Sequence, residues 1–597
     1  MKRRTRSTTR SKSKWRSRAR LVVLLFLLGA GGILGYFFLP NNMEIASLDR
    51  SRLNILIEDR LISEGREPQI VNEEILLPVD TVKRHIDNNI YWDEKADKVT
   101  ITTKDKLIRM KTDSLNALVN HKPVTLSLPV TKIDGAVYVP IEFLSDFYRI
   151  DIDYVKNANV IIIDYSGREK KFAAPIKKKT VIRKEMSRRE PIIKKLDTEK
   201  DSPEELKLKV LEEHEKWFKV RAFDGSIGYI EKSSVELTET TPAKLPEEKE
   251  PVTAWKPEKG RINMAWDAIY KNTSISSKMK EVKGLDVLSP TFFEIEDASG
   301  TVLNKVNSGY IKWAHNKGYK VWALLSNDFK SIEDTSKLLN DTDARDNAIR
   351  QILAYSALYK LDGINIDFEN VYKRDKDALT QFVREITPLL HEQGLTVSVD
   401  VNVPDGSENY SLCYDRKALA EIVDYVMLMA YDQHWSTSPK AGSVSQITWV
   451  ESKLEKTLTE VPAEKLILGV PFYTRLWKEE KGAGGKIKVS SSNGLFMAAA
   501  KKNIDENKAK VSWEEESGQF YAEYVKNDIR HRLWLEDENS INLRASLVLK
   551  YNLAGTSVWS KDADATGAWE VLRKNLKDVS DYQEWLEKNK DKEYSYK

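Results

Sequence analysis

Apolar and polar positions follow two different periods along residues 255–580. Short apolar runs typical of buried strands are separated by stretches in which apolar residues recur every three or four positions, as on one helix face. Leu379, Phe382, Ile386 and Leu390 form one such face, which ends before Gly394. The predicted strands begin at Asn263, Leu285, Lys320, Gly363, Thr396, Asp424, Leu466 and Thr556. Eight strands alternating with helices predict a (β/α)8 barrel, with functional residues at the carboxyl ends of its strands.

The fourth predicted strand carries acidic side chains on one face. Because side chains alternate along a strand, Asn365, Asp367 and Glu369 share that face, and the apolar residues between them point toward covering helices. Burial and a like-charged neighbour both raise the pKa of a carboxyl group, which lets it keep a proton and act as a general acid. A metal site and a solvated acidic strand end are the alternative interpretations of this pattern.

Residues 45–165 contain an internal repeat with an offset of 62 positions. The segment that begins LLPVDTV at Leu76 matches the one that begins YVPIEFL at Tyr138, so that Pro78 pairs with Pro140. Each copy predicts a short helix after a proline and then two alternating strands. The pattern resembles the copper amine oxidase N-terminal-like domain of bacterial envelope proteins. We see no His/Cys/Met cluster for copper here, so a spacer or wall-binding α+β module is expected.

A second small β domain is predicted over residues 176–238. Two alternating strands between Trp217 and Val235 are joined at Asp224-Gly225, which is a hairpin signal. This stretch resembles the bacterial SH3-like domain, a small β-barrel whose relatives often bind peptidoglycan; a purely structural barrel is the alternative. Residues 239–254 are rich in Pro and Glu and predict an extended linker, and residues 581–597 form a C-terminal tail.

The first forty residues predict a membrane anchor. Residues 21–40 are uncharged and mostly apolar, and twenty helical residues span about 30 Å, the thickness of a bilayer core. Residues 1–20 hold ten Lys/Arg and no Asp/Glu, which places this tail in the cytoplasm and the rest of the chain outside it. A cleaved signal peptide is the alternative, although the run ends in Leu39-Pro40-Asn41-Asn42 rather than a small-residue cleavage pattern.

Length, charge and cysteine content narrow the function further. The chain has 597 residues, enough for three or four domains, and a net charge of +4. Beyond the first twenty residues it holds 85 basic and 91 acidic residues, so the body offers no electrostatic footprint for nucleic acid. Its one cysteine, Cys413, excludes an intramolecular disulfide framework and a multi-cysteine zinc site.

Four stretches of the predicted barrel resemble glycoside hydrolase family 18, which includes chitinases and peptidoglycan N-acetylglucosaminidases. Residues 361–369, LDGINIDFE, match its active-site signature. Residues 426–432, 469–473 and 555–559 resemble its sixth, seventh and eighth strands. The accessory modules and the stretch YDQHW from Tyr431 resemble the envelope and spore-germination branch. The resemblance implies no cofactor.

The resemblance implies a role for each matching residue. Glu369 is expected to protonate the glycosidic oxygen, Asp367 to hold the substrate's acetamido N–H, and Tyr431 to donate to the acetamido oxygen. The substrate's own acetamido group replaces the second carboxylate as the nucleophile. The residues expected to bind substrate are Asp432, Trp559, Trp435, Asn365 and Tyr473.

Two further expectations concern neighbouring residues. Many chitinases carry Asp at the position of Asn365, so we expect Asp367 to ionise more easily here. Asp362 is expected to have a structural role at the strand start. About half of the six aromatic residues near strand ends are expected to line the groove; they are Trp266, Phe292, Phe293, Trp322, Trp435 and Trp477.

The sequence thus predicts a membrane-anchored extracytoplasmic glycosidase that hydrolyses N-acetylglucosamine-containing glycan. Peptidoglycan is the favoured substrate because the chain is predicted to lie beside it. Its expected partners are this glycan polymer and, through the N-terminal helix, membrane lipid, with no nucleic acid. The alternatives are a chitin or chito-oligosaccharide hydrolase and a catalytically silent glycan-binding wall scaffold.

Overall fold

The computed structural model of the chain describes residues 20, 22–24, 40–244, 254–270, 273–329, 331–481, 486–492, 494–563 and 567–596. The predicted basic tail and nearly all of the predicted anchor lie outside these residues. Within the described ranges, none of the helices is long and apolar enough to cross a membrane. The chain forms two compact units, Met1–Asn88 with Ser127–Lys249, and Asn89–Leu126 with Glu250–Lys597. The predicted domain 45–165 is therefore divided between them.

The internal repeat is visible in the first unit as two matching strand–helix segments. Strand β4 (Glu74–Pro78) leads into α2 (Val79–His85), and β11 (Ala136–Pro140) leads into α3 (Ile141–Tyr148). Pro78 and Pro140 cap the two helices, as predicted. The two strands pair antiparallel, and Leu77 lies opposite Val139, its own repeat equivalent, so the copies meet around a local two-fold axis.

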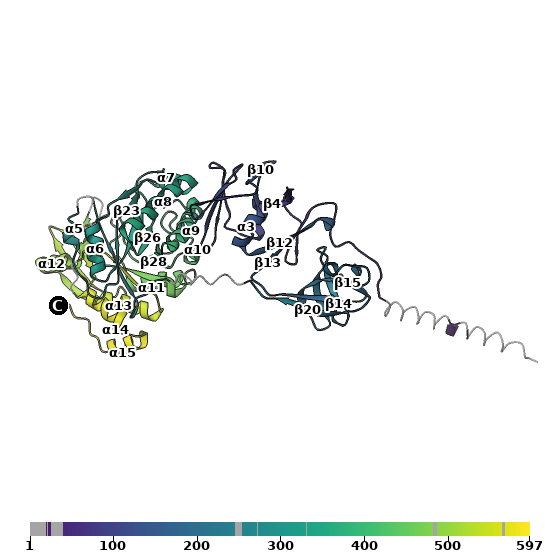
Figure 1. Cartoon of the computed structure of the whole chain (residues 1–597). Coiled ribbons are helices and arrows are strands. Elements are labelled where there is room, and N and C mark those ends of the chain that lie inside the picture. The colour runs from purple at the N-terminus through teal and green to yellow at the C-terminus, as the bar shows by residue number, and fades with distance from the viewer. Residues whose placement is uncertain are drawn as a thin grey trace, which may run out of the picture. The chain divides into compact units, whose positions relative to one another are not determined.

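Short sheets complete the first unit (Figure 1). The remaining strands of the repeat region in this unit are β1 (Asn54–Ile57), β2 (Arg60–Ile62), β3 (Gln69–Val71), β10 (Thr131–Ile133), β12 (Ile150–Val155) and β13 (Val160–Tyr165). A seven-stranded sheet contains β14 (Lys170–Pro175), β15 (Lys179–Arg183), β16 (Ile192–Asp197), β17 (Leu208–Glu213), β18 (Trp217–Arg221), β19 (Ile227–Glu231) and β20 (Val235–Thr241). The antiparallel pairing of β18 with β19 confirms the predicted hairpin, and Gly225 in its turn has φ +80°.

The second unit is built on a closed parallel barrel, as predicted. Its strands are β21 (Ile262–Asp267), β22 (Val287–Pro290), β25 (Lys320–Ser326), β26 (Gly363–Asp367), β27 (Thr396–Asn402), β28 (Tyr425–Met429), β29 (Leu466–Pro471) and β37 (Gly555–Trp559). Each strand pairs in parallel with its neighbours, and β37 returns to β21 to close the ring.

Helices surround this ring (Figure 1). They are α5 (Ile275–Lys278), α6 (Ser308–Asn316), α7 (Ile332–Leu339), α8 (Thr342–Tyr359), α9 (Lys376–Glu392), α10 (Arg416–Ile422), α11 (Ile447–Thr457), α13 (Glu538–Lys550), α14 (Ala568–Asp578) and α15 (Tyr582–Asn589). An excursion after β29 adds α12 (Met497–Asn507), β31 (Trp477–Lys481), β32 (Ile487–Ser491), β34 (Lys510–Glu514), β35 (Gln519–Lys526) and β36 (Ile529–Trp534). Within this excursion, β35 and β36 pair antiparallel as a hairpin.

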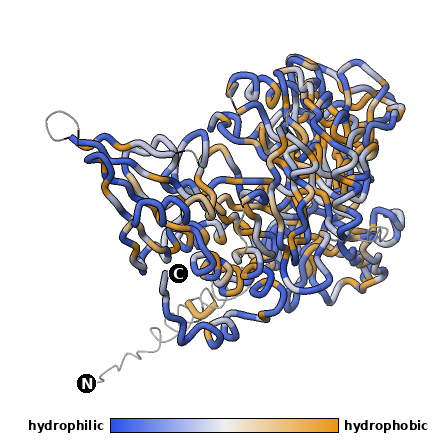
Figure 2. Tube along the Cα trace, turned by 90° about the vertical axis from the view of Figure 1, so that its left-hand side faces the viewer, coloured by the Kyte–Doolittle hydropathy of each residue, from blue (hydrophilic) through white to orange (hydrophobic). Residues whose placement is uncertain are grey.

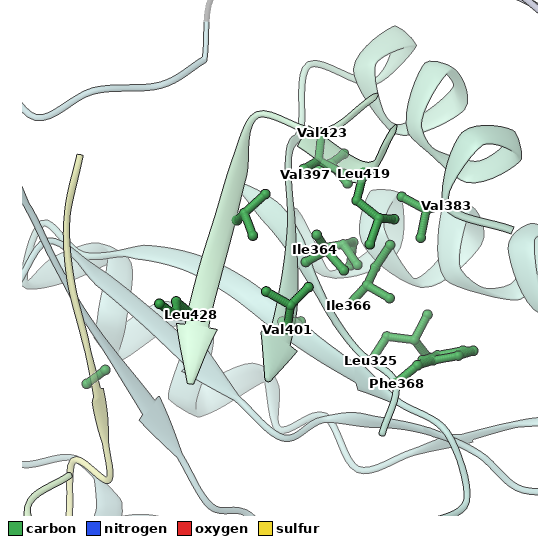
Figure 3. Close-up of a cluster of buried hydrophobic side chains, with 14 of the residues drawn as sticks. Leu325, Ile364, Ile366, Phe368, Val383, Val397, Val401, Leu419, Val423 and Leu428 are labelled. Carbon is green, nitrogen blue, oxygen red and sulfur yellow. The ribbon is translucent and has the colours of Figure 1, made fainter. Parts of the chain in front are cut away.

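The largest hydrophobic core lies between the strands and the helices. Ile364 and Ile366 point outward from β26 and are fully buried, with Phe368 just beyond the strand end. Figure 3 shows them together with Val383 of α9 and Leu419 of α10. Along the described residues, hydrophobic stretches alternate with hydrophilic ones (Figure 2). The outward face of β26 therefore packs against the helices, and the side chains of its inner face are the ones that can take part in chemistry.

A five-stranded sheet belongs to the same unit as the barrel. It contains β5 (Tyr91–Asp93), β6 (Lys98–Thr102), β7 (Leu107–Lys111), β8 (Asn116–Val119) and β9 (Lys122–Thr125). Arg109 of β7 and Arg345 of α8 both bind Glu385 of α9, with N–O distances of 3.0 and 2.9 Å. Burial alone would raise the pKa of Glu385, but the two guanidinium groups lower it to about 2. This buried ion cluster ties the sheet to the barrel helices.

Candidate active site

Asn365 lies on the inner face of β26 and is completely buried. Its Oδ1 accepts hydrogen bonds from Trp266 Nε1 at 2.9 Å and Ser289 Oγ at 3.1 Å. Its Nδ2 donates to Ser398 Oγ at 3.1 Å and Asp400 Oδ1 at 2.8 Å. The predicted contact of Asn365 with substrate does not fit this geometry, because a fully buried amide with four partners has no free polar group. Asn365 instead organises the floor of the site.

Asp367 follows Asn365 on the same face and is 9% exposed. Its Oδ1 is buried and has no hydrogen-bond partner among the described residues. Burial raises the pKa of Asp367 well above its usual range, and the nearby carboxyls of Glu369 and Asp400 raise it further. A buried acceptor without a donor is costly, so this oxygen is suited to a donor that arrives with a substrate.

Glu369 lies just beyond the end of β26, and its backbone is held by one side chain. Its N–H donates to Asn327 Oδ1 at 2.9 Å, and Asn327 Nδ2 donates back to its carbonyl at 2.8 Å. Burial raises the pKa of the Glu369 carboxyl, and Asp432 adds to the rise, although Asn402 Nδ2 donates to Oε2 at 3.3 Å and opposes it. A fixed carboxyl that holds its proton to higher pH meets the requirements of a general acid.

The loop after β28 brings Tyr431 and Asp432 to the same end of the barrel. Tyr431 packs edge-on against Trp266 and Tyr473, with ring centroids 6.4 and 6.3 Å apart. Burial raises the pKa of the Tyr431 phenol well above its usual value, so it remains a hydrogen-bond donor. Asp432 has a left-handed backbone, with φ 55°, which is uncommon for a residue other than glycine.

Tyr473 and Arg475 hold the Asp432 carboxylate. Tyr473 OH donates to Asp432 Oδ1 at 2.6 Å, and Arg475 Nη2 donates to the same oxygen at 2.9 Å. Tyr473 itself is only 6% exposed. In this structure its hydroxyl supports Asp432, and its predicted contact with substrate stays a prediction.

The aromatic residues separate into one exposed ring and a buried set. Trp435 is 52% exposed, and its Nε1 donates to Thr437 Oγ1 at 2.9 Å. Trp559 is half-buried at the end of β37 and packs against Trp266, with centroids 6.4 Å apart. The expectation that half of the six aromatic residues line the groove is wrong, because these are at most 1% exposed: Trp266, Phe292, Phe293, Trp322 and Trp477.

Strand β27 contributes polar residues that the sequence analysis missed. Ser398, Asp400 and Asn402 alternate with valines along the strand and bond to Asn365 or Glu369. The alternation of polar and apolar residues in β27 could have placed these side chains on one face. It could not have identified their partners on β26, because the register between the two strands cannot be deduced from either strand alone. Asp362, by contrast, has the predicted structural role, with its carboxylate bound to Lys320, His315 and the Val321 N–H.

The described residues contain no group of three His, Cys, Asp or Glu side chains arranged to hold a metal ion. Cys413 is buried, and burial raises the pKa of its thiol to about 12. Three interacting carboxyls from β26, the loop after it and β27 lie together at the carboxyl end of a parallel barrel, where such folds place their active sites.

Comparison with known proteins agrees with this geometry. A model of the glycosyl hydrolases family 18 matches residues 262–564, so the chain belongs to that family and is a glycoside hydrolase. A model of the copper amine oxidase N-terminal domain matches residues 57–163.

Related proteins cover the barrel part of the chain. An uncharacterized glycosylase YvbX of Bacillus subtilis is 26% identical over 292 residues, which are 47% of this chain and 82% of that protein. A cortical fragment-lytic enzyme of Bacillus subtilis is 30% identical over 254 residues, which are 42% of this chain and only 57% of that enzyme. The crystal structure of the Bacillus megaterium spore cortex-lytic enzyme SleL aligns with a TM-score of 0.48 and 22% identity, covering 57% of this chain and 79% of that one.

Proposed function

We propose that the protein is a membrane-anchored, extracytoplasmic N-acetylglucosaminidase that cleaves peptidoglycan. One observation carries the glycan chemistry: Asp367 presents a buried oxygen that no described residue binds, close to Glu369, a fixed carboxyl whose pKa is raised. The first is suited to accept an amide N–H and the second to donate a proton. A glycan with a 2-acetamido group beside the scissile bond offers both an amide N–H for Asp367 and a glycosidic oxygen for Glu369 to protonate.

The proposed reaction proceeds in two steps with retention of configuration. Glu369 protonates the leaving glycosidic oxygen while the substrate's acetamido oxygen attacks the anomeric carbon and forms an oxazolinium ion. Asp367 holds the acetamido N–H and balances the positive charge, and Tyr431 donates to the acetamido oxygen. Glu369 then removes a proton from water as the water attacks. Holding the acetamido group in line makes the first attack intramolecular, which lowers its entropic cost.

Substrate contacts extend this site. Asp432, held by Tyr473 and Arg475, faces the sugar at the cleavage point, and Trp559 lies under it as an apolar floor. Trp435 offers an exposed ring for a sugar further along the chain. The resemblance to the family motifs supports these proposed roles.

The cellular setting follows from the N-terminal sequence. A cytoplasmic basic tail and an anchor over residues 21–40 leave the barrel on the wall side of a membrane. The domain that follows the copper amine oxidase N-terminal-like repeat is proposed to be SH3-like and to bind the wall. Peptidoglycan is favoured over chitin because an anchored enzyme meets the wall first. The cortical fragment-lytic relative supports a wall glycan.

The proposal is tested with Glu369→Gln, which keeps the shape of the side chain and removes the acid. We expect the rate on N-acetylglucosamine oligomers to fall by about 10²–10⁴-fold. Glu421→Gln, a charge removal at an exposed position of α10, is the matched control and is expected to retain activity. Full activity in Glu369→Gln would refute the assignment. Glycan binding without hydrolysis by the unaltered protein would favour the wall scaffold.

A further inference from the structure

Asp400 is a buried carboxyl that the proposed reaction does not use. It lies on the inner face of β27, is 1% exposed, and accepts a hydrogen bond from Asn365 Nδ2 at 2.8 Å. Asn365 in turn is two residues before Asp367 on the same strand face. Asp400 is therefore coupled to the proposed active site through a side chain that has no freedom to rearrange, since all of its polar atoms are bonded.

The charged and titratable groups around Asp400 are known from each neighbouring element. Asp367 of β26, Glu369 beyond it and Tyr431 beyond β28 interact with it electrostatically. No lysine or arginine among the described residues forms an ion pair with Asp367, Glu369 or Asp400. Two buried cations of the barrel are paired with other carboxylates: Arg475 binds Asp432, and Lys561 binds Asp267. The pocket thus holds several carboxyls with no compensating cation.

We propose that Asp400 is a positioning residue for hydrolysis: it orients the Asn365 amide and shares with Asp367 the negative charge that this pocket holds. This inference rests on the proposed function. Two carboxyls in a buried pocket without a cation do not both ionise readily, so a charge on one favours a proton on the other. The functional unit is then an Asp367–Asp400 pair contributed by two adjacent strands.

The titration behaviour of both groups supports this coupling. Burial raises the pKa of Asp400 well above its usual range, the hydrogen bond from Asn365 opposes the rise, and the Glu369 carboxyl adds to it. Burial likewise raises the pKa of Asp367, with Glu369 and Asp400 as the further causes. Formation of the oxazolinium ion next to Asp367 draws the shared charge onto that residue and leaves Asp400 protonated.

The pair also revises what Asn365 implies. An asparagine at this position was expected to make Asp367 easier to ionise than in relatives with an aspartate there. The structure instead places a second carboxyl against the Asn365 amide, from the neighbouring strand. A carboxyl on β27 therefore lies beside the position at which many chitinases carry a carboxyl on β26.

The test is the pH dependence of kcat for the full chain in detergent on a chito-oligosaccharide. Asp400→Asn keeps an oxygen that accepts from Asn365 but cannot carry charge, so the acidic limb should move to lower pH by about one unit. Asn365→Asp adds a carboxyl and should move it to higher pH. The double exchange Asn365→Asp/Asp400→Asn should return the limb toward that of the unaltered protein. Asp424→Asn, at a buried aspartate just before β28, is the control and should leave the acidic limb in place.

The outcomes separate this inference from the function on which it rests. If Asp400→Asn lowers kcat without moving the acidic limb, Asp400 has only a packing role and the inference is wrong. If Asp400→Asn fails to fold, an unmoved limb in Asn365→Asp overturns the inference by itself. Glu369→Gln is assayed in parallel, since its full activity would defeat the proposed function whatever Asp400 does.

Discussion

Two buried carboxyl clusters in the barrel unit show opposite electrostatics. On the outer side, Glu385 of α9 is fully buried between Arg109 and Arg345, and its pKa falls to about 2. At the strand ends, Asp367 and Asp400 are also buried but have no ion-pair partner in the described part of the chain, and their pKa values rise. The same functional group, a buried carboxyl, is fixed as a charge in one place and left ready to exchange a proton in the other.

The contrast distinguishes a structural carboxyl from a functional one. Burial is unfavourable for a charge in both clusters, and only a cation from a neighbouring element offsets it. The outer cluster has that cation, so it contributes to the stability of the barrel with its bound sheet. The inner cluster has no such cation among the described residues. Holding its carboxyls in reactive protonation states therefore lowers the stability of the fold.

The largest effect is expected at the outer cluster. Glu385→Leu leaves two buried arginines without their shared carboxylate and should cost about 3–5 kcal/mol of unfolding free energy, measured by urea denaturation. Because the folded pKa of Glu385 is lowered, its stabilisation is complete above the unfolded value of about 4.3 and is lost as pH falls toward about 2. The difference from the unaltered protein should shrink over that window, while kcat of the folded enzyme stays within about twofold.

At the inner cluster a substitution is expected to reduce activity rather than stability. Asp367→Asn should reduce kcat by about 10²–10³-fold, the usual cost of losing one preorganised electrostatic contact to a transition state, with no loss of stability. Steady-state kinetics on a chito-oligosaccharide measures it. A variant that loses stability but keeps its rate would place Asp367 with the structural carboxyls.

Asp400→Asn sharpens the same contrast through stability. Because the folded pKa of Asp400 is raised, the group destabilises the fold as pH rises through its folded pKa. Its removal should therefore raise the unfolding free energy at pH 7 by about 0.5–2 kcal/mol, and the gain should disappear below about pH 4. Denaturation midpoints at the two pH values test this, and a loss of stability at pH 7 would contradict it.

The smallest effect is expected at Trp435, the exposed aromatic residue. Trp435→Ala removes an apolar sugar platform worth about 1–2 kcal/mol, so KM for long glycans should rise roughly 5–30-fold with kcat on a disaccharide reporter unchanged. Leu358→Ala, an exposed apolar position on α8, is the control. Equal KM values for the two variants would remove Trp435 from the binding surface.

The sequence was most informative where one strand or helix sufficed. The alternation in residues 363–369 assigned Ile364 and Ile366 to the core and Asn365 and Asp367 to the inner face, and the structure agrees. It could not identify Asp400 as a neighbour of Asn365, because that contact depends on the register between two strands.

The same limit applied to the aromatic residues and to the accessory domain. Trp266 was considered for the groove, but its indole N–H is used inside the barrel by Asn365. No signal in the sequence indicated the role of Arg109, since its acidic partners Asp346 and Glu385 lie 237 and 276 positions away in sequence. Local pattern predicts elements and faces, whereas long-range pairing decides which polar residues meet.

Product analysis tests the central claim most directly. The full chain in detergent, with Glu369→Gln as control, is incubated with purified peptidoglycan and with chitin oligosaccharides, and new reducing ends are identified by mass spectrometry. We predict N-acetylglucosamine reducing ends from peptidoglycan that are absent with the variant. Products from chitin oligosaccharides alone would contradict the wall substrate, and the same products from Glu369→Gln would contradict the active site itself.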